Sequence, residues 1–286
     1  MTKIIDEKAY AKLNISLDVA GKREDGYHNM LMVMQSVSLS DDLRIELNDS
    51  GIVTAHSNYR FVPGDDRNLA VKAAKVFFAK HGDKSAGAYI HIKKHIPVGS
   101  GMGGGSADAA AVLKALNRVC GYPFSDTELA DIGAEVGSDV PFCVIGGTAL
   151  VQGRGEVITP LPPMPKCRFV ICKPSFSIST PELFKKLDAV PNRRHPDTAG
   201  IMEALEAGDL NRIGRRMYNV FEEVSDRRLR CVSEIKSILL DHGALGAVMT
   251  GTGSAVFGVF DNDTKAESAS TALRKEHEFS SVAECV

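Results

Sequence analysis

A glycine-rich segment that runs directly into an alanine-rich segment constrains this sequence more than any other feature. Five of the seven residues from Gly99 to Gly105 are glycine, and SADAAAVLKALNRVCG, which starts at Ser106, has the spacing of a helix. The preceding GAYIHIKKHIP alternates like a strand. A strand, a glycine loop and a helix in this order are typical of anion sites, where backbone N–H groups and the positive end of a helix dipole meet.

Phosphate is the anion that suits such a loop best. Glycine allows positive φ angles, and a Cβ atom would block the approach of phosphate oxygens. A Walker A loop needs Lys before the Ser, where this chain has Gly105. Gly99–Gly104 satisfies G-x-G-x-x-G, but no strand ending in an acidic residue follows about 20 positions later, which disfavours a dinucleotide fold. The His-Arg-Asp and Asp-Phe-Gly tripeptides of protein kinases are absent from the sequence.

Composition points to a globular protein that acts on small molecules. The chain has 286 residues, 44% of them hydrophobic, which is enough for two domains. With 34 basic against 36 acidic residues, no net charge attracts nucleic acid or anionic lipid, so we expect neither partner. We find no signal peptide or membrane span and expect a cytoplasmic protein with reduced cysteines. The sequence by itself defines no oligomeric state.

The order of predicted elements divides the chain into an α+β fold with two domains. AKLNISLDVAG, from Ala11, alternates like a half-buried strand, and Ser125 with Glu128 forms a capping box before a helix. The prolines of PLPPMPKC indicate a boundary near residue 160, so we predict domains at 1–160 and 161–286. In the second domain, GDLNRIGRRMYNVFEEV has the pattern of a helix.

Three motifs resemble those of the GHMP small-molecule kinases. PVGSGMGGGSADAA resembles their second motif, whose loop wraps ATP phosphates, AKLNISLDVAGKREDGYH is similar to the first, and MTGTGSAVFG resembles the third. The resemblance covers nearly the whole chain. It implies an N-terminal domain like ribosomal protein S5 domain 2, a ferredoxin-like α+β C-terminal domain, and an ATP-dependent kinase that uses Mg²⁺.

The first motif is closest to one branch of this family. The resemblance implies phosphorylation of the 2-hydroxyl of a cytidine diphosphate-linked methylerythritol, in the non-mevalonate route to isoprenoid precursors. It further implies that the family's third motif packs against the phosphate loop. Ser106, at the start of the predicted helix, can reach Mg²⁺ or a phosphate. The expected ATP contacts are Pro97, Gly99, Gly101, Gly103, Gly104, Gly105, Ser106 and Asn68. By its pattern Asn68 is primarily a helix cap, and an N-cap role explains Ser106 equally well.

Phosphoryl transfer to an alcohol needs a group that accepts or orients the hydroxyl proton. Asp139 lies between EVG and VPFCV, where an unpaired carboxylate among apolar residues would be costly, so it requires a cationic partner. Lys12, on the polar face of the first strand, can supply that charge and meet the transferring phosphate. The family has its catalytic pair at the matching positions, and we predict that Asp139 and Lys12 are catalytic.

The resemblance also assigns the substrate contacts. Tyr27 and Phe184 would sandwich the cytosine ring, the backbone of His28 would read its edge, and Asn14 would bind the erythritol part. Taken alone, each aromatic side chain is more often a core residue than a ligand wall.

Alternatives from other classes stay open at this point. A nicotinamide oxidoreductase would explain G-x-G-x-x-G but leaves Lys12 and Asp139 without roles. A catalytically silent nucleotide-binding module would keep the loop without needing that pair. Among kinases of the same family, homoserine and mevalonate kinases share the loop, and Tyr27 with His28 argues against them.

Overall fold

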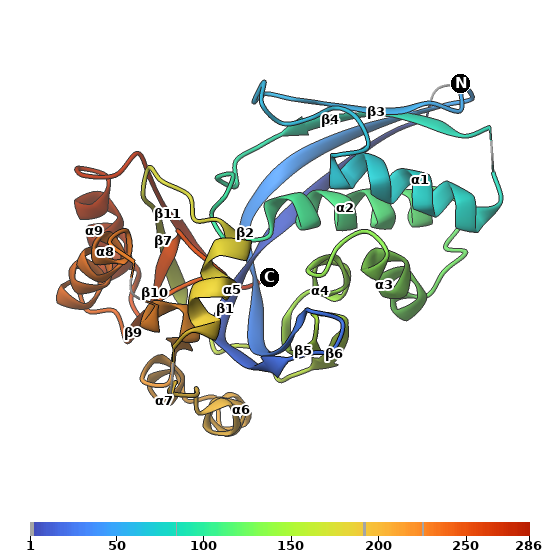
Figure 1. Ribbon diagram of the computed structural model, residues 1–286. Coiled ribbons are helices and arrows are strands. Elements are labelled where there is room, and N and C mark those ends of the chain that lie inside the picture. Colours follow the sequence, from blue (N-terminus) through green and yellow to red (C-terminus); the bar gives the residue numbers. More distant parts are fainter. Residues whose placement is uncertain (1–2, 84, 191–192, 225) are drawn as a thin grey trace.

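The computed structural model describes residues 3–83, 85–190, 193–224 and 226–286. Within these ranges the strands form two sheets, one of seven strands and one of four (Figure 1). The seven-stranded sheet has the order β3-β4-β2-β1-β8, and β5 pairs with β2 and with β6. Its strands are β1 (Ile4–Lys22), β2 (His28–Asn48), β3 (Val53–Ser57), β4 (Gly87–Lys93), β5 (Thr148–Gly153), β6 (Val157–Pro160) and β8 (Tyr218–Asn219).

Two long antiparallel strands form the spine of this sheet. β1 and β2 pair from Ile4 opposite Glu46 to Lys22 opposite His28, with register shifts that bend the ladder. β4 and β5 also pair with β2 antiparallel. A dinucleotide-binding oxidoreductase would require a parallel, doubly wound sheet, so the architecture argues against that alternative.

Four helices accompany this sheet, and their ends follow local sequence signals. Asn68 caps the first by accepting from the backbone N–H of Ala70, and Gly82 ends it with a φ of 84°. The capping box of Ser125 and Glu128 is confirmed. The helices are α1 (Leu69–His81), α2 (Gly104–Val119), α3 (Asp126–Ala134) and α4 (Val140–Ile145).

Helix α2 lies beside α1 and packs its alanine-rich face on β1 (Figure 1). Ala109, Ala110 and Leu113 are fully or almost fully buried in the core. The small side chains let the helix approach the strand closely, which fixes the glycine loop at its N-terminus over the centre of β1. The helix begins two residues before the predicted start, because Gly103 occupies the N-cap in the left-handed region.

The second sheet has the strand order β11-β7-β10-β9 and is antiparallel throughout. Numbered along the chain this is the order 4-1-3-2 of a ferredoxin-like fold, so the expected C-terminal architecture is confirmed. Helices α8 and α9 pack against it (Figure 1). The elements of this half are β7 (Arg168–Lys173), α5 (Thr180–Asp188), α6 (Thr198–Glu206), α7 (Leu210–Gly214), the 3-10 helix η1 (Val220–Glu223), α8 (Leu229–Asp241), β9 (Gly246–Met249), β10 (Val256–Phe260), α9 (Asp263–Leu273) and β11 (Phe279–Ala283).

The predicted helix over GDLNRIGRRMYNVFEEV is wrong. This segment forms α7, then strand β8, then η1. The helix ends at Gly214, and Asn219 is extended. The Asn219 side chain accepts from Phe221 N and donates to the carbonyl oxygens of Met249 and Gly251, which holds this segment against the turn. Strand β8 pairs with β1 in the first sheet, although the chain has already entered the second sheet at β7. The division at residue 160 therefore stays a prediction.

The expectation that β1 is half-buried is also wrong. Every residue from Ala11 to Val19 is buried, including the polar positions Lys12, Asn14 and Ser16. The alternation of side chains was correctly identified, but the polar face is covered by the glycine loop and by the turn after β9. This burial places polar groups of β1 inside the candidate site.

Candidate active site

The glycine loop between β4 and α2 depends on glycine at several positions. Gly99, Gly101 and Gly103 have φ angles of 66°, 80° and 69°. A Cβ atom on Gly101 would lie 2.3 Å from the carbonyl oxygen of Thr250, and one on Gly103 would lie 3.1 Å from Cγ of Lys12. The loop therefore needs glycine for its backbone conformation and for its contacts with the rest of the protein.

Two cavities meet at this loop. The smaller, of about 390 Å³, is lined by Asn68, Pro97, Gly104, Gly105 and neighbouring residues. The larger, of about 790 Å³, extends toward the second sheet. The residues that line both are Leu69, Gly99, Gly101, Gly103 and Ser106. The loop therefore lies between the two cavities, and molecules bound in them would face each other across it.

Lys12 and Asp139 lie together in the larger cavity. Nζ of Lys12 is 3.6 Å from Oδ2 of Asp139 and donates a hydrogen bond of 2.8 Å to Oδ1 of Asn14. The Lys12 side chain is 5% exposed and that of Asp139 is 34% exposed. Asp139 occupies the N-cap position of α4 but makes no capping hydrogen bond. The sequence led us to expect this carboxylate among apolar residues. In the structure it is instead open to the cavity.

Asn14 connects Lys12 to the turn after β9. Its Oδ1 also accepts from the backbone N–H of Gly251 at 3.0 Å and from Oγ1 of Thr250 at 3.2 Å. The side chain is fully buried and does not line the larger cavity. In this conformation Asn14 positions the lysine, and the structure does not bring it to the place expected for the polyol.

The turn MTGTGSAVFG joins the second sheet to the loop, as the resemblance implied. The backbone N–H of Ala255 donates to the carbonyl oxygen of Ser100 at 3.0 Å. A Cβ atom on Gly251 would lie 2.7 Å from the carbonyl oxygen of Gly101. Such close backbone packing makes the position of the loop depend on both sheets.

The far end of the larger cavity is aromatic, but its geometry differs from the predicted sandwich. The ring of His28 stacks on Phe184 with centroids 4.7 Å apart, and its Nε2 lies 2.8 Å from Oδ1 of Asp188. Tyr27 is 52% exposed, and the guanidinium of Arg154 lies 3.9 Å above its ring. Tyr27 and Phe184 line the same cavity, yet the stacked neighbour of Phe184 is the His28 side chain.

Several polar residues of this cavity were missed by the sequence reasoning. Lys22, Arg154 and Lys185 bring positive charge to its lining, and Asp188 brings a carboxylate. The GRGE segment between β5 and β6 was a usable signal, because an arginine between two glycines is free to reach a neighbouring site. Basic side chains are the usual partners of a diphosphate.

The smaller cavity contains Asn68, whose amide is already engaged. Its Oδ1 accepts from Ala70 N at 2.9 Å, and its Nδ2 donates to the carbonyl oxygen of Pro63 at 2.8 Å. Phe61, another residue that the sequence reasoning missed, lines this cavity and is 68% exposed. Ser106 is the third residue of α2, so its reading as an N-cap is wrong.

Three buried charges lie beneath the loop. Nζ of Lys94 binds Asp41 and lies 2.7 Å from Oδ2 of Asp108, and these three side chains are at most 5% exposed. Two carboxylates thus share one ammonium, and Oδ1 of Asp108 has no hydrogen-bond partner among the described residues. Burial raises the pKa of Asp108 to about 7, against the lowering effect of Lys94.

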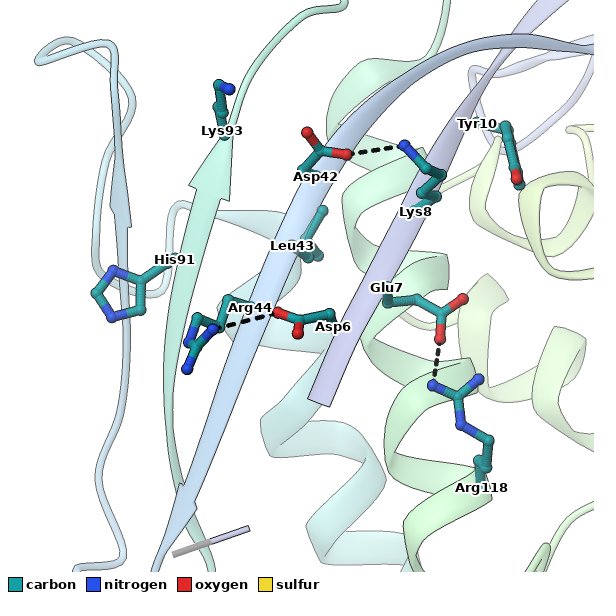
Figure 2. Close-up of a pocket in the computed structure, with 10 residues that line it drawn as sticks. All are labelled: Asp6, Glu7, Lys8, Tyr10, Asp42, Leu43, Arg44, His91, Lys93 and Arg118. Atoms are coloured by element: carbon teal, nitrogen blue, oxygen red, sulfur yellow. Dashed lines mark hydrogen bonds and ion pairs between the residues drawn. The ribbon is translucent and has the colours of Figure 1, made fainter. Parts of the chain in front are cut away.

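A further groove, of about 620 Å³, lies along β1, β2 and β4, and none of its described lining residues borders either cavity of the site. Figure 2 shows Lys8 beside Asp42 and Glu7 beside Arg118, which form ion pairs of 3.0 and 2.7 Å. The charges that face one another there neutralise each other, and the groove contains none of the predicted site residues.

Among the residues that the structure describes, no group of three or more His, Cys, Asp and Glu side chains is arranged to hold a metal ion. No helix in the part of the chain that the structure describes is long and apolar enough to cross a membrane.

Comparisons with known proteins agree with the fold and with the class of enzyme. The family model for the N-terminal domain of GHMP kinases matches residues 68–147, and the model for their C-terminal domain matches residues 201–278. Together with the loop between two cavities, this defines an ATP-dependent small-molecule kinase of the GHMP class. The 4-diphosphocytidyl-2-C-methyl-D-erythritol kinase of Clostridium acetobutylicum is 44% identical over 271 residues, which cover 94% of this chain and 96% of that protein. The chain belongs to the family of 4-diphosphocytidyl-2-C-methyl-D-erythritol kinases.

Solved structures support the same grouping. A crystal structure described as 4-(cytidine 5'-diphospho)-2C-methyl-D-erythritol kinase is 31% identical, with a TM-score of 0.81 and coverage of 98% of both chains. A homoserine kinase from Cytophaga hutchinsonii has a TM-score of 0.78 at 21% identity, covering 100% of this chain and 95% of that one. The second likeness shows the shared fold alone.

Proposed function

We propose that this chain transfers the γ-phosphoryl group of ATP to the 2-hydroxyl of 4-diphosphocytidyl-2-C-methyl-D-erythritol. The observation that carries the proposal is the position of Lys12 and Asp139 in the larger cavity, next to the loop that separates it from the smaller one. ATP in the smaller cavity would direct its phosphates across the loop, and the alcohol would approach from the larger cavity. Both reactants are thereby held in line, which is the main requirement of phosphoryl transfer.

The two catalytic candidates would divide the charge and the proton between them. Asp139 would accept or orient the proton of the attacking hydroxyl, because its carboxylate is open to the cavity. Lys12 is held by Asn14 within reach of Asp139, where it would neutralise charge on the transferring group. The N-terminus of α2 and the backbone N–H groups of the loop would bind the β- and γ-phosphates.

The residues present are suited to Mg²⁺ that is held mainly by ATP. Oxygen ligands are what Mg²⁺ prefers, and it usually takes only one or two protein groups beside phosphates and water. The hydroxyl of Ser106 lines the larger cavity at the loop and would be such a group. Mg²⁺ held there would neutralise charge on the phosphates of ATP.

The nucleotide end of the substrate would occupy the aromatic end of the larger cavity. The cytosine ring would pack on Tyr27 and on the His28–Phe184 pair, while Arg154, Lys22 and Lys185 would face the diphosphate. This arrangement replaces the simple sandwich of Tyr27 and Phe184.

The decisive experiment measures ADP release with Mg-ATP and 4-diphosphocytidyl-2-C-methyl-D-erythritol. Homoserine, mevalonate and a reaction without acceptor serve as controls. We expect turnover with the cytidyl substrate only, and NMR of the product should show phosphate on the 2-hydroxyl. Turnover with another alcohol would contradict the cytosine site. ADP release that is the same without acceptor would contradict alcohol phosphorylation. The cytoplasmic location stays a prediction, which cell fractionation would test.

A further inference from the structure

Outside the two cavities of the candidate site, two cysteine thiols lie next to each other at one end of the second sheet. Sγ of Cys167 and Sγ of Cys285 are 3.8 Å apart, although 118 positions separate them in the sequence. Strand register explains this proximity. Phe169 of β7 pairs with Ala283 of β11, and two more steps along the same antiparallel register bring Cys167 opposite Cys285.

The surroundings of the two thiols admit a small reagent. Cys285 is partly exposed, whereas Cys167 is buried but lines a surface hollow of about 370 Å³ together with Lys166, Asn262 and Thr264. The contact with the Cys167 sulfur lowers the pKa of Cys285, and the same contact raises the pKa of Cys167. The lowered pKa favours the thiolate form of Cys285, and the 3.8 Å separation places a second sulfur beside it.

The 284–286 segment also contacts the first sheet. The backbone N–H of Ser38 donates to the carbonyl oxygen of Glu284 at 2.8 Å, Cys285 forms a bridge with Val37, and the N–H of Val286 donates to the carbonyl oxygen of Ser36 at 3.2 Å. Figure 1 shows the end of the chain near β1 and β2. A covalent bond to Cys167 would tie the start of β7 to a segment that is already hydrogen-bonded to β2.

We propose that Cys167 and Cys285 form a reversible, peroxide-sensitive disulfide that fastens the 284–286 segment to β7. The Cys285 thiolate attacks one oxygen of hydrogen peroxide, the O–O bond breaks, hydroxide leaves, and Cys285 becomes a sulfenic acid. The sulfur of Cys167 then attacks the sulfur of Cys285, the S–O bond breaks, and the hydroxyl leaves with the thiol proton as water. Overall, two thiols lose two electrons and two protons, and one peroxide becomes two waters.

The chemical test uses the full chain, fully reduced and then treated with hydrogen peroxide. We expect a mass decrease of about 2 Da per chain, from the loss of two hydrogens. Four of the six cysteines should remain open to alkylation, and a digest should contain a peptide that links positions 167 and 285. Dithiothreitol should reverse all three changes. Oxygen added at Cys285 without a linked peptide would overturn the proposal, and so would a disulfide between two chains.

Variants separate this pair from the other thiols. Cys285→Ser, at a partly exposed position, and Cys167→Ala should each abolish the linked peptide. Cys231→Ser, at a partly exposed position on α8, should retain it as the matched control. If Cys167→Ala fails to fold, the comparison of linked-peptide yield between Cys285→Ser and Cys231→Ser tests the pairing. A linked peptide elsewhere in Cys285→Ser, equal in yield to wild type, would show that the pairing is not specific.

A second measurement tests the fastening itself. A disulfide that closes a loop of 118 residues restricts the unfolded chain, so the oxidised wild type should unfold about 5 °C or more above the reduced form. The rise should be absent in Cys285→Ser and present in Cys231→Ser. An unchanged unfolding temperature in a fully cross-linked sample would overturn the stabilising role. None of these readouts depends on kinase activity, so they stand or fall separately from the proposed reaction.

Discussion

At the scale of single residues, Asp139 is the side chain on which the proposed chemistry depends most. In Asp139→Asn the amide keeps the size of the side chain but neither accepts the hydroxyl proton nor pairs with Lys12 at 3.6 Å. We expect kcat to fall about 100-fold or more, with little change in the KM for ATP. Asp131→Asn, an exposed carboxyl on α3, is the control and should retain wild-type rates. Near wild-type kcat in a folded Asp139→Asn would remove Asp139 from the reaction.

The aromatic end of the larger cavity leads to a second prediction about single residues. Phe184→Ala removes the ring that stacks on His28 and packs edge-on against Phe221. We expect the KM for the cytidyl substrate to rise about tenfold or more, because base stacking contributes ~1 to 3 kcal/mol per aromatic. The KM for ATP should stay close to wild type.

Phe61→Ala gives a reciprocal control on the other side of the loop, since Phe61 lines only the smaller cavity. It should raise the KM for ATP and leave the KM for the cytidyl substrate unchanged. Steady-state kinetics with each substrate varied in turn measure both values. If the two variants affected the same substrate, the assignment of the two cavities would be wrong.

At the scale of elements, the contact between the glycine loop and the β9–β10 turn governs how the site is assembled. Gly101→Ala places a Cβ atom 2.3 Å from the carbonyl oxygen of Thr250, in a residue with a φ of 80°. Relieving this overlap requires the loop and the β9–β10 turn to move apart. We expect a loss of about 2 to 4 kcal/mol in the free energy of unfolding and a marked fall in kcat/KM for ATP.

Gly82→Ala separates the cost of the positive φ angle from the cost of the overlap with Thr250. Gly82 ends α1 with a φ of 84°, but nothing lies within 4 Å of its added Cβ atom. The cost there should be only the conformational one, about 1 to 2 kcal/mol, with normal activity. Urea unfolding and steady-state kinetics of both variants provide the comparison. Equal losses of stability, with activity retained in both, would show that the loop does not depend on close packing against the turn.

At the scale of the whole molecule, the buried charges beneath the loop make stability depend on pH. The pKa of Asp108 is raised from 3.8 to about 7, chiefly by burial. Between these values the folded chain holds a proton that the unfolded chain has lost, so this group's contribution to stability falls as the pH rises through that window. Above about pH 7 Asp108 is ionised in the folded chain, and the resulting loss in the free energy of unfolding is complete. This penalty is at most about 4 kcal/mol, at ~1.4 kcal/mol per pH unit.

Asp108→Asn should remove this penalty, because Lys94 keeps Asp41 as its partner. Between pH 5 and pH 8 the wild type should lose stability relative to Asp108→Asn, as measured by urea unfolding at each pH. Asp41→Asn is the contrasting variant and should be strongly destabilised at pH 8, since Asp41 also accepts from the backbone of His95 and Ile96. A constant difference between wild type and Asp108→Asn across this range would contradict the raised pKa.

Local patterns were enough to predict most of the elements. Asn68, Gly82 and the capping box of Ser125 and Glu128 satisfy the first and last backbone groups of their own helices, so their effect does not depend on distant segments. The glycine loop is similar, because the positive φ angles at Gly99, Gly101 and Gly103 restrict the residue type wherever the loop lies. The order of the motifs identified the family.

The sequence by itself therefore determined the caps that begin α1 and α3, the phosphate loop and the class of enzyme. The caps and the loop depend on interactions within short stretches of chain. Only the tertiary structure decided which polar groups are buried and what they touch. Lys12 and Asn14 alternate with apolar residues like a solvent-facing set, yet the loop and the β9–β10 turn cover them. Asn219 lies in a strand where a helix was predicted and bonds a turn 30 positions away, and Phe184 stacks on His28 from a distant segment. Burial is a property of the surface that covers a residue, and that surface comes from segments remote in sequence.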